Sequence, residues 1–229
     1  MDYDVIIIGA GLSGLAAGIR LAHFGRRVCI VEKHRLVGGL NSVYRRHGRE
    51  FEVGLHAMTN YVPRHVKEAP LNRLLRQLRI RYDDLDLVPQ NHSEIRFPDT
   101  LLRFTNGIAE LEEEVATHFP DQIAGFRELV KNVRGQEVYR LTPERGSARQ
   151  ELVKCIHDPM LREMLLCPMM YYGNSMENDM SFTQFCVLFR SVFLEGFCKL
   201  RHGMRQLLDL LLYRFEDCGG DMLLNTGVD

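Results

Sequence analysis

The chain lacks the marks of several large classes of protein. Its 29 basic and 30 acidic side chains among 229 residues leave a formal net charge of −1, so nothing pulls it as a whole toward nucleic acid or an anionic membrane. No apolar run is long enough to span a bilayer, and there is no internal repeat or low-complexity segment. With 45% hydrophobic and 26% charged residues, the composition is that of an ordinary globular protein of one large or two modest domains.

Signs of secretion, metal binding and side-chain catalysis are also missing. The six cysteines show no CxxC pair and no metal-ligand spacing, so they are predicted to be reduced core residues. No Ser-His-Asp set or catalytic carboxylate pair stands out. The first apolar run begins almost at Met1 with acids around it, which does not fit a signal peptide. We therefore expect a cytoplasmic protein without a metal or a nucleic-acid partner, and leave peripheral membrane association and oligomeric state open.

The stretch that organises the chain is a glycine motif at its start. Residues 5–8 are a β-branched apolar run, which predicts a parallel strand buried on both faces. Gly9 allows a sharp turn, Gly11 lets a pyrophosphate approach the backbone, and Gly14 lets the next helix pack close to the strand. That helix is predicted over residues 15–24, and the free N–H groups at its start favour phosphates.

A second strand and a second glycine pair give the motif its context. Residues 28–31 predict the second strand, and Glu32 closes it, where an acid accepts hydrogen bonds from ribose hydroxyls. This context disfavours an ordinary glycine turn without a ligand. Gly38 and Gly39 follow, a pair that nicotinamide-binding domains do not need and large flavoproteins use at the FAD pyrophosphate. A plain loop is the alternative for this pair.

Residues 43–54 predict a hairpin that turns at His47 and Gly48 and leads into a Phe-Glu-x-Gly-x-His stretch. Together, the GxGxxG, Val-Glu, Gly-Gly-x-x-Ser and Phe-Glu-x-Gly-x-His motifs resemble the phytoene desaturase, carotenoid isomerase and retinol saturase branch of the FAD-dependent amine-oxidase-like superfamily. The resemblance is strong to residue 60 and looser afterwards. It implies FAD as cofactor, bound by Gly9, Ala10, Gly11, Leu12, Ser13, Gly14, Glu32, Lys33, Gly38, Gly39, Leu40, Asn41, Ser42, Gly54, Leu55, His56 and Val228.

Two of these assignments carry particular questions. His56 either bonds flavin ring atoms or shapes the substrate cavity, or it is a hydrogen-bonded histidine at a turn. Val228 matches a valine whose backbone meets the adenine in the family. The turn before the last helix departs from the family's Pro-x-Gly-Gly, because residues 200–203 keep only the final glycine.

The resemblance also implies a fold and a function. The fold is α/β, a discontinuous Rossmann-like FAD-binding domain of the glutathione reductase type with an inserted α+β substrate domain. Residues 1–60 form its first segment, 61–196 a partial substrate domain, and 197–229 the return. The implied function is an FAD-dependent oxidoreductase acting on carbon–carbon bonds of a hydrophobic polyene or isoprenoid, as in carotenoid biosynthesis. The alternatives are an amine oxidase-like or other flavin oxidoreductase with a polar substrate, a non-catalytic flavin-binding module, and an NAD-only dehydrogenase.

Hydrophobic periodicity predicts the remaining elements. Four methionines within residues 160–170 suit an apolar ligand cavity or a plain core. Phenylalanines in 181–197 suit a lipid tunnel, a membrane face or a packed core helix. The predicted elements are helices over 71–80, 108–118, 122–134 (with Asp121 as N-cap), 151–167 (broken at Asp158-Pro159) and 204–217, short strands within 85–105 and over 222–226, and a loop over 141–149.

The chain matches only the front part of a full member of this family. We therefore expect it to be an N-terminal fragment, whose missing part would complete the substrate domain. The sequence leaves open the substrate, the direction of the redox change and the electron acceptor.

Overall fold

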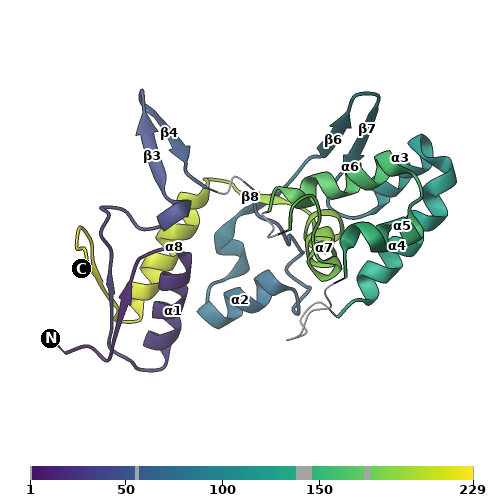
Figure 1. Ribbon diagram of the computed structural model, residues 1–229. Helices are drawn as coiled ribbons and strands as arrows, with labels where there is room; N and C mark the ends of the chain where they lie inside the picture. Colours follow the sequence, from purple (N-terminus) through teal and green to yellow (C-terminus); the bar gives the residue numbers. More distant parts are fainter. Residues whose placement is uncertain (1, 55–56, 138–145, 173–175, 229) are drawn as a thin grey trace. The chain divides into compact units, whose positions relative to one another are not determined.

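A computed structural model describes residues 2–54, 57–137, 146–172 and 176–228 (Figure 1). Leu55, His56 and most of the predicted loop 141–149 lie outside these residues. The chain divides into two compact units, one of Met1–Met58, Pro63–Val88 and Cys198–Asp229, the other of Thr59–Val62 and Pro89–Phe197. The first unit thus includes residues 63–88, which the sequence assigned to the substrate domain.

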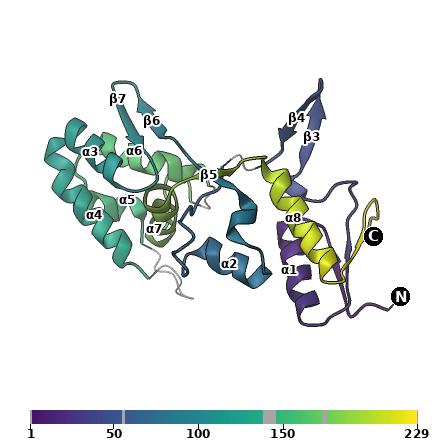
Figure 2. The same ribbon diagram turned by 180° about the vertical axis from the view of Figure 1, so that it is seen from behind.

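The first unit is built on a parallel sheet. Strands β1 (Val5–Ile8), β2 (Val28–Val31) and β9 (Asp221–Leu223) lie in the order β1-β2-β9, with Ile6 opposite Cys29 and Ile30 opposite Met222. Helix α1 (Leu12–His23) connects β1 to β2, and α8 (Met204–Asp217) precedes β9. The two helices lie side by side in both views (Figures 1 and 2). Their apolar faces share one core with β2.

Strand β1 corrects one prediction. It was expected to be buried on both faces, but Ile6 and Ile8 are 62% and 70% exposed, while β2 is buried throughout. The alternating burial of β1 arises because one face of the strand packs on the unit's core, and nothing among the described residues covers the other face. A β-branched run therefore indicated the strand correctly but not its burial.

The remaining elements of the first unit surround this βαβ arrangement. The predicted hairpin is confirmed, with His47 and Gly48 at positive φ (51° and 75°) in its turn. The elements are the 3₁₀ helix η1 (Gly39–Asn41), hairpin strands β3 (Val43–Arg46) and β4 (Arg49–Glu52), α2 (Pro70–Leu78), η2 (Tyr82–Leu85), and β5 (Leu87–Pro89) paired with β8 (Cys198–Leu200).

The second unit is mainly helical with one antiparallel hairpin. The hairpin strands are β6 (Ser93–Phe97) and β7 (Thr100–Phe104). Around them lie α3 (Ala109–His118), η3 (Pro120–Gln122), α4 (Ile123–Gly135), α5 (Ala148–Cys155), α6 (Pro159–Met170), α7 (Phe182–Phe189) and a π-helix (Arg190–Glu195).

The core of this second unit settles two open alternatives. Phe185, Phe189 and Phe193 are fully buried and pack ring against ring, with centroids 5.5 and 4.9 Å apart. Met164 and Met169 are also fully buried in the same cluster. The membrane-face interpretation of the phenylalanine segment is therefore wrong, and both segments are core.

Helix boundaries follow local capping. Asp158 caps α6 by accepting the N–H of Leu161 at 2.9 Å, which confirms the predicted break. Asp121 is not the N-cap of α4, because it lies inside η3 and Gln122 precedes the helix. Helix α1 starts three residues earlier than predicted, at Leu12. Among the described residues, no helix is both long and apolar enough to cross a membrane.

Candidate dinucleotide-binding site

The turn after β1 is shaped by the first glycine motif. Gly9 has φ +101° and its N–H donates to Val31 O at 2.8 Å, which ties the turn to the end of β2. Gly11 is the N-cap of α1, in extended conformation, and has no side chain to satisfy the helix's first N–H groups. A Cβ on Gly14 would lie 2.1 Å from Gly9 O, so only glycine lets the helix start this close. The helix N-terminus is thus left open toward an anion.

The second glycine pair lies against the first motif. Gly38 donates its N–H to Ala10 O at 2.8 Å and forms a parallel bridge with Gly11. A Cβ on Gly39 would meet only Gly11 Cα, at 3.5 Å, and a Cβ on Gly11 would have nothing within 4 Å. Two stretches of backbone without side chains therefore face open space side by side. Such an arrangement admits a phosphate group to within hydrogen-bonding distance of backbone N–H groups.

A buried hydroxyl without a partner lies beside this glycine pair. Ser42 is 8% exposed, and its Oγ forms no hydrogen bond. Its backbone is fixed, since Ser42 N–H donates to Gly39 O at 3.1 Å and Ser42 O accepts from Val53 at 2.9 Å. Gly54, the residue after Val53, lies against the same loop, because a Cβ there would be 2.3 Å from Leu40 O. Buried polar side chains nearly always have partners, and the Ser42 hydroxyl has none among the described residues.

Glu32 links the two glycine loops to β2. It is 8% exposed, and its two oxygens accept the N–H groups of Ala10 and His34, each at 2.8 Å. Burial disfavours the charged carboxylate, but these two N–H groups outweigh it and hold the pKa of Glu32 below its usual value. Each oxygen keeps a second lone pair, which a ribose hydroxyl can use.

The structure places the other predicted site residues with less definition. Leu12 and Ser13 lie in the first turn of α1, Lys33 and Leu40 are exposed, and Asn41 ends η1. Val228 is 54% exposed. The residues just before it are hydrogen-bonded to the loop after β2. Thr226 N–H donates to Glu32 O at 2.9 Å, and Asn225 N–H donates to His34 O at 3.2 Å. The structure therefore brings the end of the chain alongside Glu32, from nearly 200 residues away in sequence.

Sequence reasoning missed Leu208, on α8. Its Cδ1 would lie 2.6 Å from a Cβ on Gly38, so α8 supports the second glycine loop from the core side. The apolar spacing of residues 207, 208, 211 and 212 predicted the helix, but no sequence signal indicated which residue contacts the loop.

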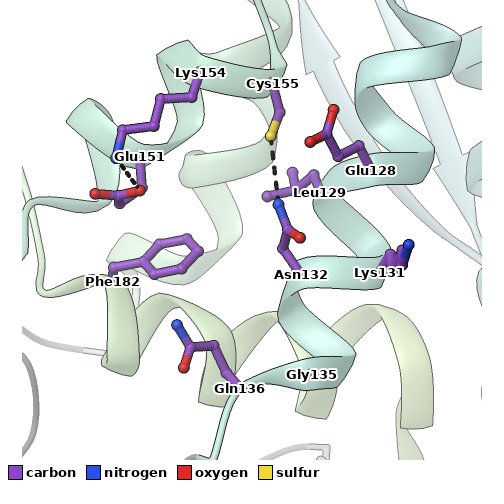
Figure 3. A pocket seen from close by; sticks show the side chains of 10 residues that line it. All are labelled: Glu128, Leu129, Lys131, Asn132, Gly135, Gln136, Glu151, Lys154, Cys155 and Phe182. Atoms are coloured by element: carbon purple, nitrogen blue, oxygen red, sulfur yellow. Dashed lines mark hydrogen bonds and ion pairs between the residues drawn. The ribbon is translucent and has the colours of Figure 1, made fainter.

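A cavity of about 630 Å³ lies in the second unit (Figure 3). Asn132 donates a hydrogen bond to the Cys155 thiol at 3.7 Å on one side of it, and Lys154 pairs with Glu151 at 2.6 Å on another. Phe182 contributes the aromatic part of the wall. This lining mixes charged, amide and apolar side chains and contains none of the four methionines that suit an apolar cavity. Within the described residues, no cluster of three or more His, Cys, Asp or Glu side chains is placed to hold a metal ion.

Comparison with known proteins agrees with the site's geometry. Residues 7–78 match the family model of an NAD(P)-binding Rossmann-like domain. All-trans-retinol 13,14-reductase of Danio rerio is 27% identical over 135 residues, or 57% of this chain and 21% of that protein. Prolycopene isomerase 2 of an Oncidium hybrid cultivar is 30% identical over 128 residues, 55% of this chain and 21% of the isomerase. A 4,4'-diapophytoene desaturase of Staphylococcus haemolyticus is 25% identical across 98% of this chain and 48% of the desaturase.

Solved structures show the same fold. An oxidoreductase from Methanosarcina mazei matches with a TM-score of 0.74 and 16% identity, over 96% of this chain and 50% of the other. A putrescine oxidase variant matches with a TM-score of 0.60 and 19% identity, over 97% and 50%. The chain thus spans between about a fifth and a half of the length of these five proteins. The relatives confirm the resemblance drawn from the motifs: this chain is similar to the retinol reductases, prolycopene isomerases and diapophytoene desaturases of the FAD-dependent amine-oxidase-like superfamily.

Proposed function

We propose that the backbone of the two glycine loops, where Gly11 and Gly39 lie side by side, binds FAD. The observation that carries this proposal is the side-by-side approach of two backbone stretches without side chains, at Gly11 and at the Gly38-Gly39 pair, with the unpartnered Ser42 hydroxyl in the same loop. A pyrophosphate there would accept the N–H groups at the start of α1 and the Ser42 O–H. Glu32, ionised and fixed by two N–H donors, would accept the ribose hydroxyls. The residues present therefore fit a flavin dinucleotide.

We infer further that the protein is an FAD-dependent oxidoreductase acting on carbon–carbon bonds of a long apolar polyene or isoprenoid. The support is the chemistry named in its relatives: a retinol 13,14-reductase, prolycopene isomerases and a diapophytoene desaturase. The similarity to putrescine oxidase rests on the fold and carries no argument about substrate.

FAD, when bound, supplies the chemistry by accepting or donating a hydride. The chain's own residues bind and orient the dinucleotide. The N-terminus of α1 would neutralise the phosphates and Glu32 would fix the sugar, while Gly14 and Gly38 hold the helix and the second loop in contact with the first turn. Because Glu32 is ionised, it also repels a phosphate on the ribose, which favours an unphosphorylated dinucleotide.

The cofactor is tested by the visible spectrum of the purified chain, followed by denaturation and identification of the released molecule. Released FAD supports the proposal. The proposal is contradicted if the purified chain is colourless and a titration with FAD, followed by flavin fluorescence, shows no binding. The substrate class is tested separately, by anaerobic mixing of the flavin-loaded protein with a polyene such as a carotene precursor and, as the matched control, with a primary amine. We expect the polyene to reduce the flavin or to be converted itself, and we expect the amine to leave the flavin oxidised.

A further inference from the structure

The β3–β4 hairpin has two faces of different composition. Residues paired across it alternate between faces, as in any antiparallel ribbon. The inner face carries both acids, Glu50 and Glu52, and both are engaged. Glu50 pairs with Arg45 at 3.0 Å, and Glu52 accepts the N–H of Met204 at the start of α8, at 2.5 Å.

The outer face of the hairpin carries only aromatic and basic side chains. Tyr44 and Phe51 are stacked there, with ring centroids 5.3 Å apart and planes at 16°, and they remain 51% and 41% exposed. Next along the same face come Arg46 and Arg49, directly opposite each other in the register. Neither arginine has an ion-pair partner in the part of the chain that the structure describes. The ribbon stands out from the unit beyond the end of α8 (Figures 1 and 2).

The pairing of two arginines across a hairpin has an energetic cost. Like charges at directly opposed positions destabilise an antiparallel pair, and no acid among the described residues pairs with either arginine. An external anion placed over the pair would remove this repulsion. Residues 43–52 and 199–205 together carry six Lys or Arg and two Glu. Arg45, Arg201 and Arg205 are paired with Glu50, Asp86 and Asp209, so the positive charge of this surface comes from Arg46, Arg49 and Lys199. A cavity of about 550 Å³ beside the aromatic pair is lined by Lys199, Arg201, His202 and Arg205 and also by Glu50 and Glu52.

We propose that the outer face of the β3–β4 hairpin docks the protein on an anionic phospholipid surface. Tyrosine and phenylalanine suit the boundary between headgroups and acyl chains, because the rings are apolar and the tyrosine hydroxyl stays wet. Arg46 and Arg49 would meet lipid phosphates, and arginine binds phosphate through paired N–H groups. A single-stranded nucleic acid fits less well, since one face of each ring is already covered by the other ring. The proposal does not depend on the flavin site.

Vesicle co-sedimentation tests the proposal. The chain is mixed with vesicles of phosphatidylcholine alone or of phosphatidylcholine and phosphatidylglycerol in equal parts. We expect binding only to the anionic vesicles. Raising the salt from about 0.1 M to about 1 M shortens the screening length from about 10 Å to about 3 Å and should release the protein. The double variant Arg46→Gln/Arg49→Gln should bind about 25-fold more weakly, from about fivefold per arginine.

Two further variants separate this surface from general charge effects. Arg73→Gln/Arg76→Gln removes the same charge from α2 in the same unit. It should change the affinity for vesicles by less than about threefold. Tyr44→Ser/Phe51→Ser keeps the charge and should also weaken binding. Melting curves of each variant establish folding, and relief of the arginine repulsion should leave the Arg46→Gln/Arg49→Gln melting temperature unchanged or higher. The proposal is overturned if the parent ignores anionic vesicles, if the hairpin and α2 variants lose binding equally, or if a single-stranded oligonucleotide competes the protein off the vesicles.

Discussion

Replacing Ser42 by alanine should affect folding and cofactor binding in opposite directions. In the chain without cofactor, the Ser42 Oγ is buried without a hydrogen-bond partner, a state that costs about 1 to 3 kcal/mol relative to a satisfied group. Alanine removes the unsatisfied hydroxyl and leaves space for only one atom, so the apo form should be as stable as the parent or more stable. For a chain of this size, each 1 kcal/mol gained raises the melting temperature by roughly 2 to 4 °C.

The same substitution should weaken FAD binding. A hydroxyl that donates to a charged phosphate contributes about 1.5 to 3 kcal/mol, so its loss should raise the dissociation constant by roughly 10- to 150-fold. Flavin fluorescence titration measures this constant. Thermal melts with and without FAD measure the linked effect, because a weaker ligand gives a smaller rise in melting temperature at equal concentration.

Ser191→Ala provides the matched control for Ser42→Ala. Ser191 is equally buried, at 6% exposure, but its hydroxyl donates to Val187 O at 2.9 Å and accepts from Asn60 at 3.0 Å. Alanine there should lower the melting temperature and leave FAD affinity unchanged. If Ser42→Ala instead behaves like Ser191→Ala, with lower stability and full FAD affinity, the Ser42 hydroxyl has a structural role and does not bind the cofactor.

Three other predictions follow from the same geometry. Gly11→Ala should fold, because its Cβ meets nothing within 4 Å, but it should lose FAD binding. Gly14→Ala should fail to fold stably, because its Cβ would meet a carbonyl oxygen at 2.1 Å; circular dichroism and flavin titration distinguish the two variants. The pKa of Glu32 is lowered in the fold, so the stability that its carboxylate contributes is complete above about pH 4.5 and is lost as the pH falls through the pKa of the folded state. The melting temperatures of the parent and of Glu32→Gln, measured from about pH 3 to pH 7, should therefore approach each other at the acid end. Burial raises the pKa of Cys186 to about 12 and of Cys198 to about 11, so maleimide at neutral pH should leave both unlabelled until the chain is unfolded, and rapid labelling of either in the native protein would contradict the burial.

The sequence predicted local elements well where the signal is local. The hairpin at His47-Gly48 needed only two residues that tolerate positive φ between two short apolar-polar runs. The start of α6 needed only Asp158 before Pro159, an N-cap followed by a first-turn proline. Such signals depend on the residues involved and their immediate neighbours, so they can be interpreted without the rest of the fold.

Predictions that depended on distant neighbours were less reliable. The phenylalanine spacing of residues 182–193 is the same for a helix in a core and a helix on a membrane, and only the packing of Phe185 against Phe189 decides between them. In β1, the run that ends in Ile8 does not show whether one or both faces are covered, because burial depends on which elements pack on the sheet. The tie between Thr226 and Glu32 likewise joins segments whose approach no local pattern encodes.

The glycines of the candidate site show why a motif alone cannot separate folding from function. Gly14 and Gly54 are required by the fold, since a Cβ at either would overlap a backbone carbonyl oxygen, at 2.1 and 2.3 Å. Gly11 is different, because an alanine would fit there without any contact in the chain. Folding alone does not account for glycine at this position, whereas the proposed cofactor would: a methyl group would occupy the space through which a phosphate would reach the helix N-terminus. Gly11 and Gly14 stand in the same motif and Gly54 in another, yet Gly14 and Gly54 are the pair that the fold requires, and only the surroundings of each Cβ show this.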